Sequence, residues 1–199
     1  MKNLVIVEHD NKTIKPSTYS TITAASKISQ DVYAIILGSG IESALEDLKK
    51  CNYLKKIFFV NNKELTEPIA ENLSSYILKF LEGKNFTHIF SPSTTFGKNL
   101  SPKISAELDV QQISDIINVI DDKTFERPIY AGNAIATVRS NDSTKVVTVR
   151  ATCFEQASLE SNVEMEEISL SDLSSDLVSF VGYDASKSDR PELTSAKII

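Results

Sequence analysis

"FTHIFSPSTTFGKNLSPKISAELD", residues 86–109, contains the unit from which the fold is built. It begins with an apolar stretch, 86–92, that has the length and composition of a buried strand. Small hydroxyl residues and a glycine follow, and apolar residues then recur at every fourth position from 96 to 108, which is the spacing of one helical face. The stretch therefore predicts a strand, a polar turn and an amphipathic helix.

Three similar units precede this one. The expected strands are "LVIVE" (4–8), "VYAIIL" (32–37) and "KIFFV" (56–60), and the expected helices cover 17–29, 41–51 and a segment capped by Thr66 that stops at Gly83. Strands that alternate with helices and are apolar on both faces are typical of a parallel sheet covered on both sides. The sequence thus predicts an α/β fold with a mostly parallel sheet and helices on both faces.

The pattern changes after residue 108. The segments "QQISDIINVI" (111–120), "RPIYAGNAIATV" (127–138) and "KVVTVRAT" (145–152) are rich in strand-forming residues, with a turn signal at 141–143. They predict additional β-strands in the second half, partly antiparallel, that extend the same sheet. One more strand is expected in "VEMEEISL" (163–170), and the last residues, 196–199, read as a strand that is just beginning.

Composition excludes several classes of function. The chain has 199 residues and a net charge of -6, and no Lys and Arg cluster with the interleaved aromatic residues that bind nucleic acid. Nothing near the start reads as a targeting peptide, and no long apolar run follows, so we expect a soluble, cytoplasmic protein without membrane insertion. Cys51 and Cys153 fit no disulfide or zinc pattern and are interpreted as reduced thiols.

The polar turn after the fourth expected strand is a candidate anion-binding or interface loop. In open α/β sheets the N-termini of helices bind anions at this edge. The stretch lacks the spacing of a phosphate-binding P-loop, so an ordinary helix entrance is the competing interpretation. The candidate residues are Ser93, Thr94, Thr95, Gly97 and Lys98.

Pro102 leaves two interpretations of the helix that follows this turn. Either Ser101 caps a helix that has Pro102 at its first position, or a longer helix bends at Pro102.

Other polar positions have ordinary structural interpretations. The turn 38–43 has G-x-G but no third glycine, and a tight strand-to-helix turn explains it. The run 8–11, Glu-His-Asp-Asn, is interpreted as exposed polar side chains rather than a metal site, because consecutive strand residues point apart. His88 lies between Phe86 and Phe90 and is expected to be buried and hydrogen-bonded rather than a base. The sequence predicts no catalytic residue and no metal site.

Five stretches together resemble a known family. They are "VEHDN" (7–11), "TTFGKNLSPKISAELDVQQISDI" (94–116), "YAGNAIATV" (130–138), "TVRAT" (148–152) and "SDRPELTSAKII" (188–199). They are similar to the N-terminal half of the α subunit of electron transfer flavoprotein, and the resemblance is weakest between 154 and 186. It implies an electron carrier rather than an enzyme, with a fold of the adenine-nucleotide α-hydrolase type.

The resemblance also implies partners and a cofactor. Such α subunits pair with a β subunit, take electrons from acyl-CoA and related dehydrogenases in fatty acid oxidation, and pass them on FAD to a membrane quinone oxidoreductase. The FAD is held mainly by a C-terminal domain whose positions lie beyond Ile199. We therefore expect an α/β domain at 1–185, a linker and first strand at 186–199, and no flavin on this chain alone.

One alternative belongs to a different class. The same architecture occurs in modules of the universal-stress type that hold AMP or ATP at the ends of the strands. In that interpretation the turns 38–43 and 93–98 form the nucleotide pocket.

Overall fold

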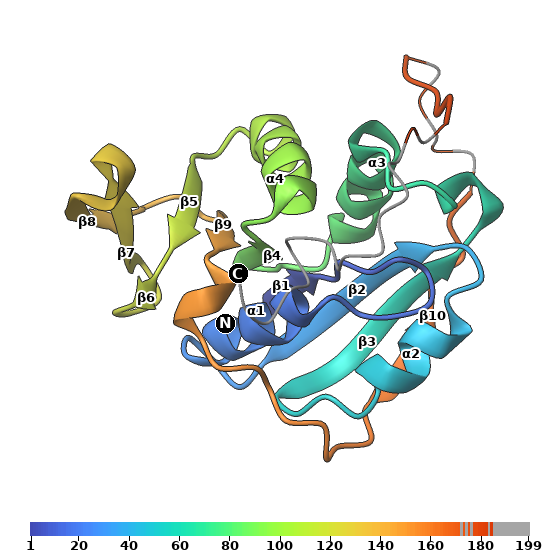
Figure 1. Ribbon diagram of the computed structural model, residues 1–199, viewed down its shortest axis with the longest axis horizontal. Coiled ribbons are helices and arrows are strands. Elements are labelled where there is room, and N and C mark those ends of the chain that lie inside the picture. The colour runs from blue at the N-terminus through green and yellow to red at the C-terminus, as the bar shows by residue number, and fades with distance from the viewer. Residues whose placement is uncertain (172, 174, 176, 183, 185–199) are drawn as a thin grey trace.

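A computed structural model describes residues 1–171, 173, 175, 177–182 and 184 (Figure 1). The helices are α1 (Pro16–Ser26), α2 (Glu42–Leu48), α3 (Ala70–Leu81) and α4 (Thr95–Glu107). The strands are β1 (Asn3–Ile6), β2 (Val32–Gly38), β3 (Leu54–Asn61), β4 (His88–Pro92), β5 (Gln112–Ile116), β6 (Asn118–Val119), β7 (Thr124–Ile129), β8 (Ala134–Arg139), β9 (Lys145–Val149) and β10 (Glu164–Glu167). The linker expected at 186–199, with its strand at 196–199, lies outside the described residues.

Seven strands form one sheet in the order β10-β3-β2-β1-β4-β9-β5, and every pairing in it is parallel. The apolar residues of α1 and α2 pack on one face, and those of α3 and α4 pack on the other. Figure 1 shows these two helical layers with the sheet between them. The predicted α/β class, with helices on both faces of a mostly parallel sheet, is confirmed.

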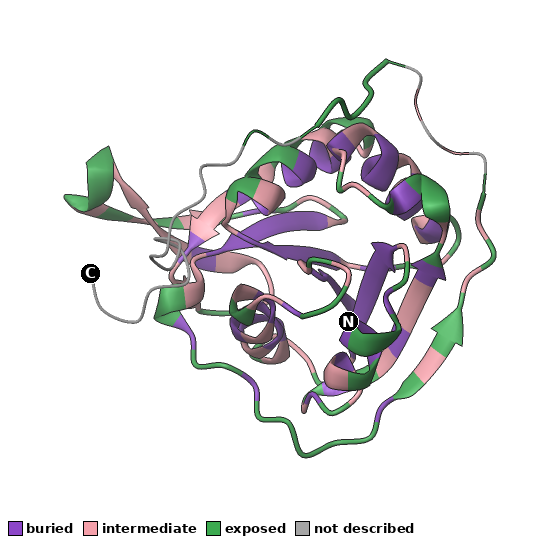
Figure 2. Cartoon of the chain, turned by 45° about the vertical axis from the view of Figure 1, so that its right-hand side comes forward, coloured by how far each residue is buried: buried purple, intermediate pink, exposed green. Residues whose placement is uncertain are grey.

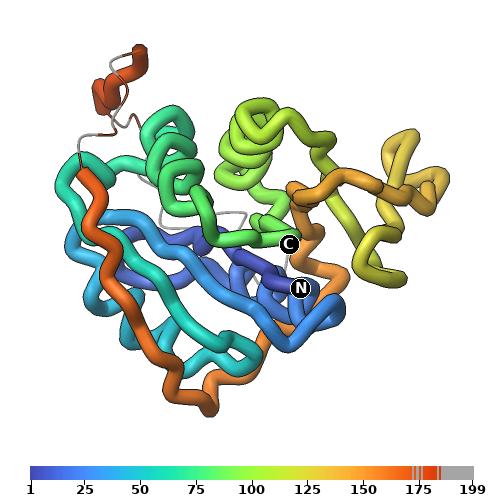
Figure 3. Tube along the Cα trace, turned by 180° about the vertical axis from the view of Figure 1, so that it is seen from behind, coloured from blue at the N-terminus to red at the C-terminus, as the bar shows by residue number. Residues whose placement is uncertain are grey.

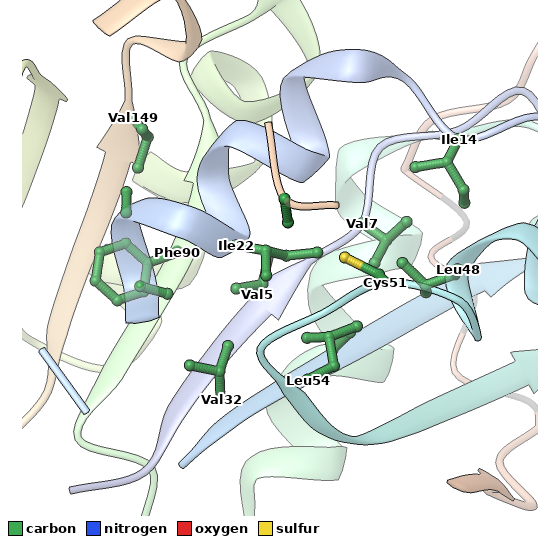
Figure 4. Packing of buried hydrophobic residues seen from close by; sticks show 14 of the residues in the cluster. Val5, Val7, Ile14, Ile22, Val32, Leu48, Cys51, Leu54, Phe90 and Val149 are labelled. Atoms are coloured by element: carbon green, nitrogen blue, oxygen red, sulfur yellow. The ribbon is translucent and has the colours of Figure 1, made fainter. Parts of the chain in front are cut away.

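The central strands are buried on both sides because their side chains alternate between two cores. On β1 and just after it, Val5 and Val7 face the core beneath α1 and α2, while Leu4 and Ile6 face the core beneath α3 and α4. All four are buried, and Figure 4 shows Val5 and Val7 in the first core. The sheet and the inner sides of the helices form the buried layer of Figure 2. Removing an apolar run of this kind from water supplies the main free energy of folding.

The second half of the chain differs from the prediction. The strands β5 and β9 do extend the sheet, with β9 inserted between β4 and β5, but β6, β7 and β8 form a separate antiparallel sheet that projects from the body (Figure 1). The prediction that all of these strands join one sheet is therefore wrong for 118–139. Along β8 exposed and half-buried residues alternate, whereas β9 is buried throughout. A strand with one solvent-exposed face does not fit inside a sheet that is covered by helices on both sides.

Of the two interpretations left open at Pro102, the longer helix is the one present, whereas the helix start predicted at Thr66 is wrong. The helix α4 is capped by Thr94, whose side chain accepts a hydrogen bond from the backbone N–H of Gly97, and it runs through Pro102. Ser101 is therefore no cap; its buried hydroxyl lies 2.6 Å from the Ser91 hydroxyl and ties α4 to β4. Thr66 does not begin α3, which is preceded by Ile69 in an extended conformation.

The strand expected within 163–170 is present as β10, at the edge of the sheet opposite β5. The chain reaches it by running beneath the α1 and α2 side, and Phe154 and Val163 are buried in that core on the way. Figure 3 shows this segment leading to β10 beside β3. Lys56 on β3 forms ion pairs with Glu164 (2.8 Å) and Glu166 (2.7 Å), so the last strand is joined to its neighbour by charge as well as by backbone hydrogen bonds. Among the described residues, no helix has the length and apolar character needed to span a membrane.

Candidate functional site

The place where this architecture commonly binds ligands lies between β1 and β4. The chain moves outward from β1 to β2 and β3, and then crosses to β4 on the other side of β1. In open α/β sheets, ligands bind beyond the carboxyl ends of the strands at such a reversal. Glu8, just after β1, and Thr94, just after β4, flank this crevice.

The crevice is occupied by a side chain of the protein. One carboxylate oxygen of Glu8, Oε2, accepts hydrogen bonds from the Ser17 hydroxyl (2.9 Å) and the Thr94 hydroxyl (3.0 Å). Ser17 belongs to the first turn of α1, and Thr94 caps α4. A carboxylate beside two helix N-termini is stabilised by their partial positive charge. Glu8 therefore lies where a phosphate group would bind in a nucleotide-binding relative of this fold.

The predicted loop residues have different surroundings. Thr94 contacts Glu8, and the backbone N–H of Ser93 donates to the Val149 carbonyl (2.8 Å). Gly97 packs so closely on the end of β4 that a Cβ would lie 1.9 Å from the Pro92 carbonyl oxygen. The side chains of Thr95 and Lys98 are exposed. The loop is a helix entrance built around an internal carboxylate, and its binding of an external anion stays a prediction.

An ion pair that the sequence analysis did not predict also lies where the parallel strands end, at their carboxyl ends. The Arg150 guanidinium, after β9, donates to both carboxylate oxygens of Asp115 on β5, with Nε at 3.3 and 3.1 Å and Nη2 also in contact. Burial disfavours the charged form of Asp115, but the hydrogen bonds and charge of Arg150 outweigh it and lower the pKa of the carboxyl group. Asp115 has a positive φ of 61° at an irregularity of β5. The pair fastens the edge strand to β9.

A hollow of about 340 Å³ lies next to this crevice, beyond the ends of β1 and β2. It is lined by His9, Asp10, Asn11, Leu37, Leu65, Thr66, Glu67 and Pro68. Two of these residues are carboxylic acids, and none is Lys or Arg, so this hollow is poorly suited to phosphate.

His9 is partly buried and hydrogen-bonded, so the interpretation of 8–11 as exposed polar side chains is wrong for this residue. Its Nε2 donates to the Leu37 carbonyl (3.0 Å), and its Nδ1 accepts from the backbone N–H of Asn11 (3.0 Å). Gly38 allows this close approach, because a Cβ there would lie 2.8 Å from the His9 ring and 2.5 Å from the Asn11 side chain. The glycine turn is thus confirmed as structural. Burial lowers the pKa of His9 and outweighs the hydrogen bond to the Leu37 carbonyl, which favours the charged form.

His88 is buried and hydrogen-bonded, as predicted. Its Nε2 donates to the Asp122 carbonyl (2.7 Å), its Nδ1 lies 2.9 Å from the Thr87 hydroxyl, and its ring stacks on Phe90. Because Asp122 precedes β7, this histidine links β4 to the projecting sheet. Burial lowers its pKa. No group of three His, Cys, Asp or Glu side chains suited to a metal ion occurs within the described part of the chain.

The two histidines lead us to expect that stability falls in mild acid. Both have lowered pKa values in the folded protein, whereas an unfolded histidine binds a proton at about pH 6.5. The two histidines therefore contribute fully to the free energy of unfolding above pH 6.5. This contribution is lost progressively as the pH drops from 6.5 toward their lower pKa values in the folded protein. Urea unfolding at pH 7.5 and pH 5.0 measures the difference. The double variant His9→Asn, His88→Asn should lose most of this dependence, and equal stability of the wild type at both pH values would contradict the expectation.

Comparison with known proteins agrees with this architecture. The family described as "Electron transfer flavoprotein domain" matches residues 3–173. The electron transfer flavoprotein subunit alpha of Pseudomonas aeruginosa is 40% identical over 199 residues, which is all of this chain and 64% of that protein. The counterpart from Bradyrhizobium diazoefficiens is also 40% identical, over 100% of this chain and 62% of its own length. The mitochondrial subunit alpha of Dictyostelium discoideum is 39% identical over 98% of this chain and 59% of its own length.

The chain spans about six tenths of the length of these relatives. The matched residues nevertheless run from β1 to beyond β10, so the whole described sheet is included. This chain belongs to the electron transfer flavoprotein domain family and is similar to its α subunits.

Proposed function

We propose that this chain is the scaffold and subunit-pairing domain of an electron transfer flavoprotein α subunit. The complete protein would be a heterodimer with a β subunit. It would carry electrons on FAD from acyl-CoA-type dehydrogenases, through a quinone oxidoreductase, to the respiratory chain. The observation that carries this proposal is 40% identity to an α subunit along the entire chain.

The crevice beside Glu8 and the hollow next to it do not fit the phosphates of FAD. A flavin dinucleotide needs free N–H groups or cations for its two phosphates. The Glu8 carboxylate lies between the helix N-termini of the crevice, and the hollow beside it carries Asp10 and Glu67. We therefore propose that the flavin is held by a part of the protein outside this chain, with 1–185 as a rigid support and 186–199 as the linker toward it. The flavin supplies the redox chemistry.

The cellular location belongs to the same proposal. We keep the cytoplasm as the expected location. Among the three relatives described above, the one from Dictyostelium discoideum is named as mitochondrial.

The test of the proposed function uses the chain alone and with its partner. The purified chain should retain no flavin after gel filtration with excess FAD, and it should co-elute in equal amounts with the β subunit from the same source. Circular dichroism confirms that both proteins are folded. Stoichiometric FAD on the 199-residue chain, or no complex with the β subunit, would refute the proposal.

If the chain were instead a nucleotide-binding module, it would bind AMP or ATP, whereas our proposal predicts that it does not. We expect no saturable heat when AMP or ATP is titrated into the chain in a calorimeter, which means a dissociation constant weaker than about 1 mM. The reason is electrostatic, because a phosphate entering the crevice would meet the negative charge of Glu8. A known AMP-binding protein serves as the positive control. Tight binding to this chain would favour the alternative.

A further inference from the structure

Val163 is the last buried residue in the part of the chain that the structure describes. Its side chain lies in the core beneath α1 and α2, and its N–H donates to the Lys49 carbonyl (2.9 Å). Every described residue after it is exposed or half-buried, including all four residues of β10. We call residues 164–171, which comprise β10 and the four residues after it, the arm. The arm adds only half-buried apolar side chains to the two cores.

The arm can leave the sheet without breaking any other strand pair. β10 pairs with β3 alone, and β3 keeps its pairing with β2 along the whole of Val32–Gly38. The six strands from β3 to β5 therefore remain a continuous sheet without β10. Beyond the arm, the hydrogen bond from the Ser175 N–H to the Asn72 side chain (2.8 Å) must also break. Segments with few buried apolar contacts open locally, at a smaller free energy than global unfolding.

Lys56 on β3 joins the arm to the body by charge. Its Nζ lies 2.8 Å from Glu164 and 2.7 Å from Glu166, which lie on the same face of β10. One cation thus joins two carboxylates whose negative charges otherwise repel each other. The Lys56 side chain is 24% exposed, so water reaches these ion pairs and keeps their strength modest. Such a contact can hold a segment closed and still release it.

We propose that the arm opens as one unit, with Val163 as its hinge and the ion pairs of Lys56 as the latch that holds it closed. Opening breaks the latch, the pairing of β10 with β3, and the hydrogen bond from the Ile168 N–H to the Phe59 carbonyl (2.8 Å). The two cores and the six-stranded sheet stay folded.

An open arm would lengthen the connection to the part of the protein that follows it. Eight residues in an extended conformation span roughly 25–30 Å. In the function proposed above, on which this consequence rests, the part that holds the flavin would then be tethered at Val163 rather than at residue 186. The arm is thus a reserve of tether that becomes available when the latch breaks.

Amide hydrogen exchange of the purified chain, followed by NMR at single residues, tests the opening. The reference is the Val7 amide, which donates to the Ile35 carbonyl (3.0 Å) in the middle of the sheet. We expect the protection factor of the Ile168 amide to be lower than that of Val7 by about 100-fold or more. Low concentrations of urea should accelerate exchange at Val7 much more than at Ile168, because global unfolding exposes far more surface than opening of the arm.

Lys56→Met and Lys55→Met separate the latch from a general loss of charge. Both variants remove one positive charge from β3, but Lys55 pairs with Asp31 (2.6 Å), just before β2, and this pair stays intact when the arm opens. Lys56→Met should lower the protection factor of Ile168 about three- to thirtyfold, the effect of losing two exposed ion pairs. Lys55→Met should leave Ile168 unchanged, so that any loss it causes appears only at Val7.

A double variant, Glu164→Gln with Glu166→Gln, removes the same ion pairs from the arm instead of from β3. It should act on the Ile168 amide as Lys56→Met does, and it decides the question if Lys56→Met fails to fold.

Three results would overturn the inference. Equal protection factors at Ile168 and Val7 would show that the arm opens only when the whole chain unfolds. An Ile168 amide that responds to neither Lys56→Met nor the double variant would show that these ion pairs are no latch. Equal losses at Ile168 in Lys56→Met and Lys55→Met would reveal a general effect of charge. None of these results bears on the binding of FAD or of a β subunit, so the arm and the proposed function fail separately.

Discussion

Replacing Gly97 by Ala is expected to lower the free energy of unfolding by about 3 kcal/mol or more. The added Cβ would lie 1.9 Å from the carbonyl oxygen of Pro92 and 2.9 Å from the Ser91 hydroxyl oxygen. The first of these neighbours is backbone at the end of β4, so it cannot move aside as the tip of a flexible side chain can. The first turn of α4 must shift instead, and the hydrogen bond between Thr94 and Glu8 is lost with it. Urea unfolding monitored by circular dichroism measures the change.

Gly40→Ala is the matched control for Gly97→Ala. Nothing lies within 4 Å of the Cβ that would be added at Gly40, although its φ is +66°. The cost is then only the strain of a left-handed conformation, about 1–2 kcal/mol. Equal losses in the two variants would mean that the helix entrance tolerates the methyl group and that the close packing described here is wrong.

Phe125→Ala is expected to lower the free energy of unfolding by about 3–5 kcal/mol. Phe125 is on β7 and completely buried, and its ring meets the His88 ring at a centroid distance of 6.4 Å. It belongs to the core beneath α1 and α2, against which Val119 and Val138 are only partly buried, so it is the most deeply buried apolar contact between the projecting sheet and the body. Thermal and urea unfolding measure the loss, and limited proteolysis should show earlier cleavage within 118–139 than in the wild type.

Ile135→Ala serves as the control for Phe125→Ala because it removes an apolar side chain from the same sheet. Its side chain is 61% exposed, and we expect a change within about 0.5 kcal/mol. If Phe125→Ala were equally mild, the projecting sheet would be held by other contacts, such as the hydrogen bond from His88 to Asp122.

The alternating units of the first half could be predicted because their signals are local. Each strand is a short apolar run, and each helix repeats within a few residues. Local signals also explain the error at Thr66. The residue before a proline avoids the helical conformation, so Pro68 prevents Glu67 from joining a helix, and α3 begins at Ala70.

The second half could not be predicted in the same way, because the sequence of a strand does not show which other strand it pairs with. β9 and β8 both read as strands, yet one is inserted between β4 and β5 and the other leaves the sheet. The contacts of the crevice have the same character. Glu8 bonds to Thr94, which is 86 residues away, and Arg150 pairs with Asp115 across 35 residues. Sequence patterns extend over only a few residues, so they could not predict contacts between residues this far apart in the chain. The sequence showed only which residue types were present.

The position of β9 imposes an order on how the chain can assemble. β5 pairs with β9 alone, and β9 follows it in the sequence only after the projecting sheet has been made. While the chain emerges from the ribosome at about 5–20 residues per second, β4 and β5 must therefore wait, for a few seconds, with open edges. During this interval the nascent chain exposes unpaired strands, which are prone to aggregation, and a slow codon before residue 145 would lengthen it.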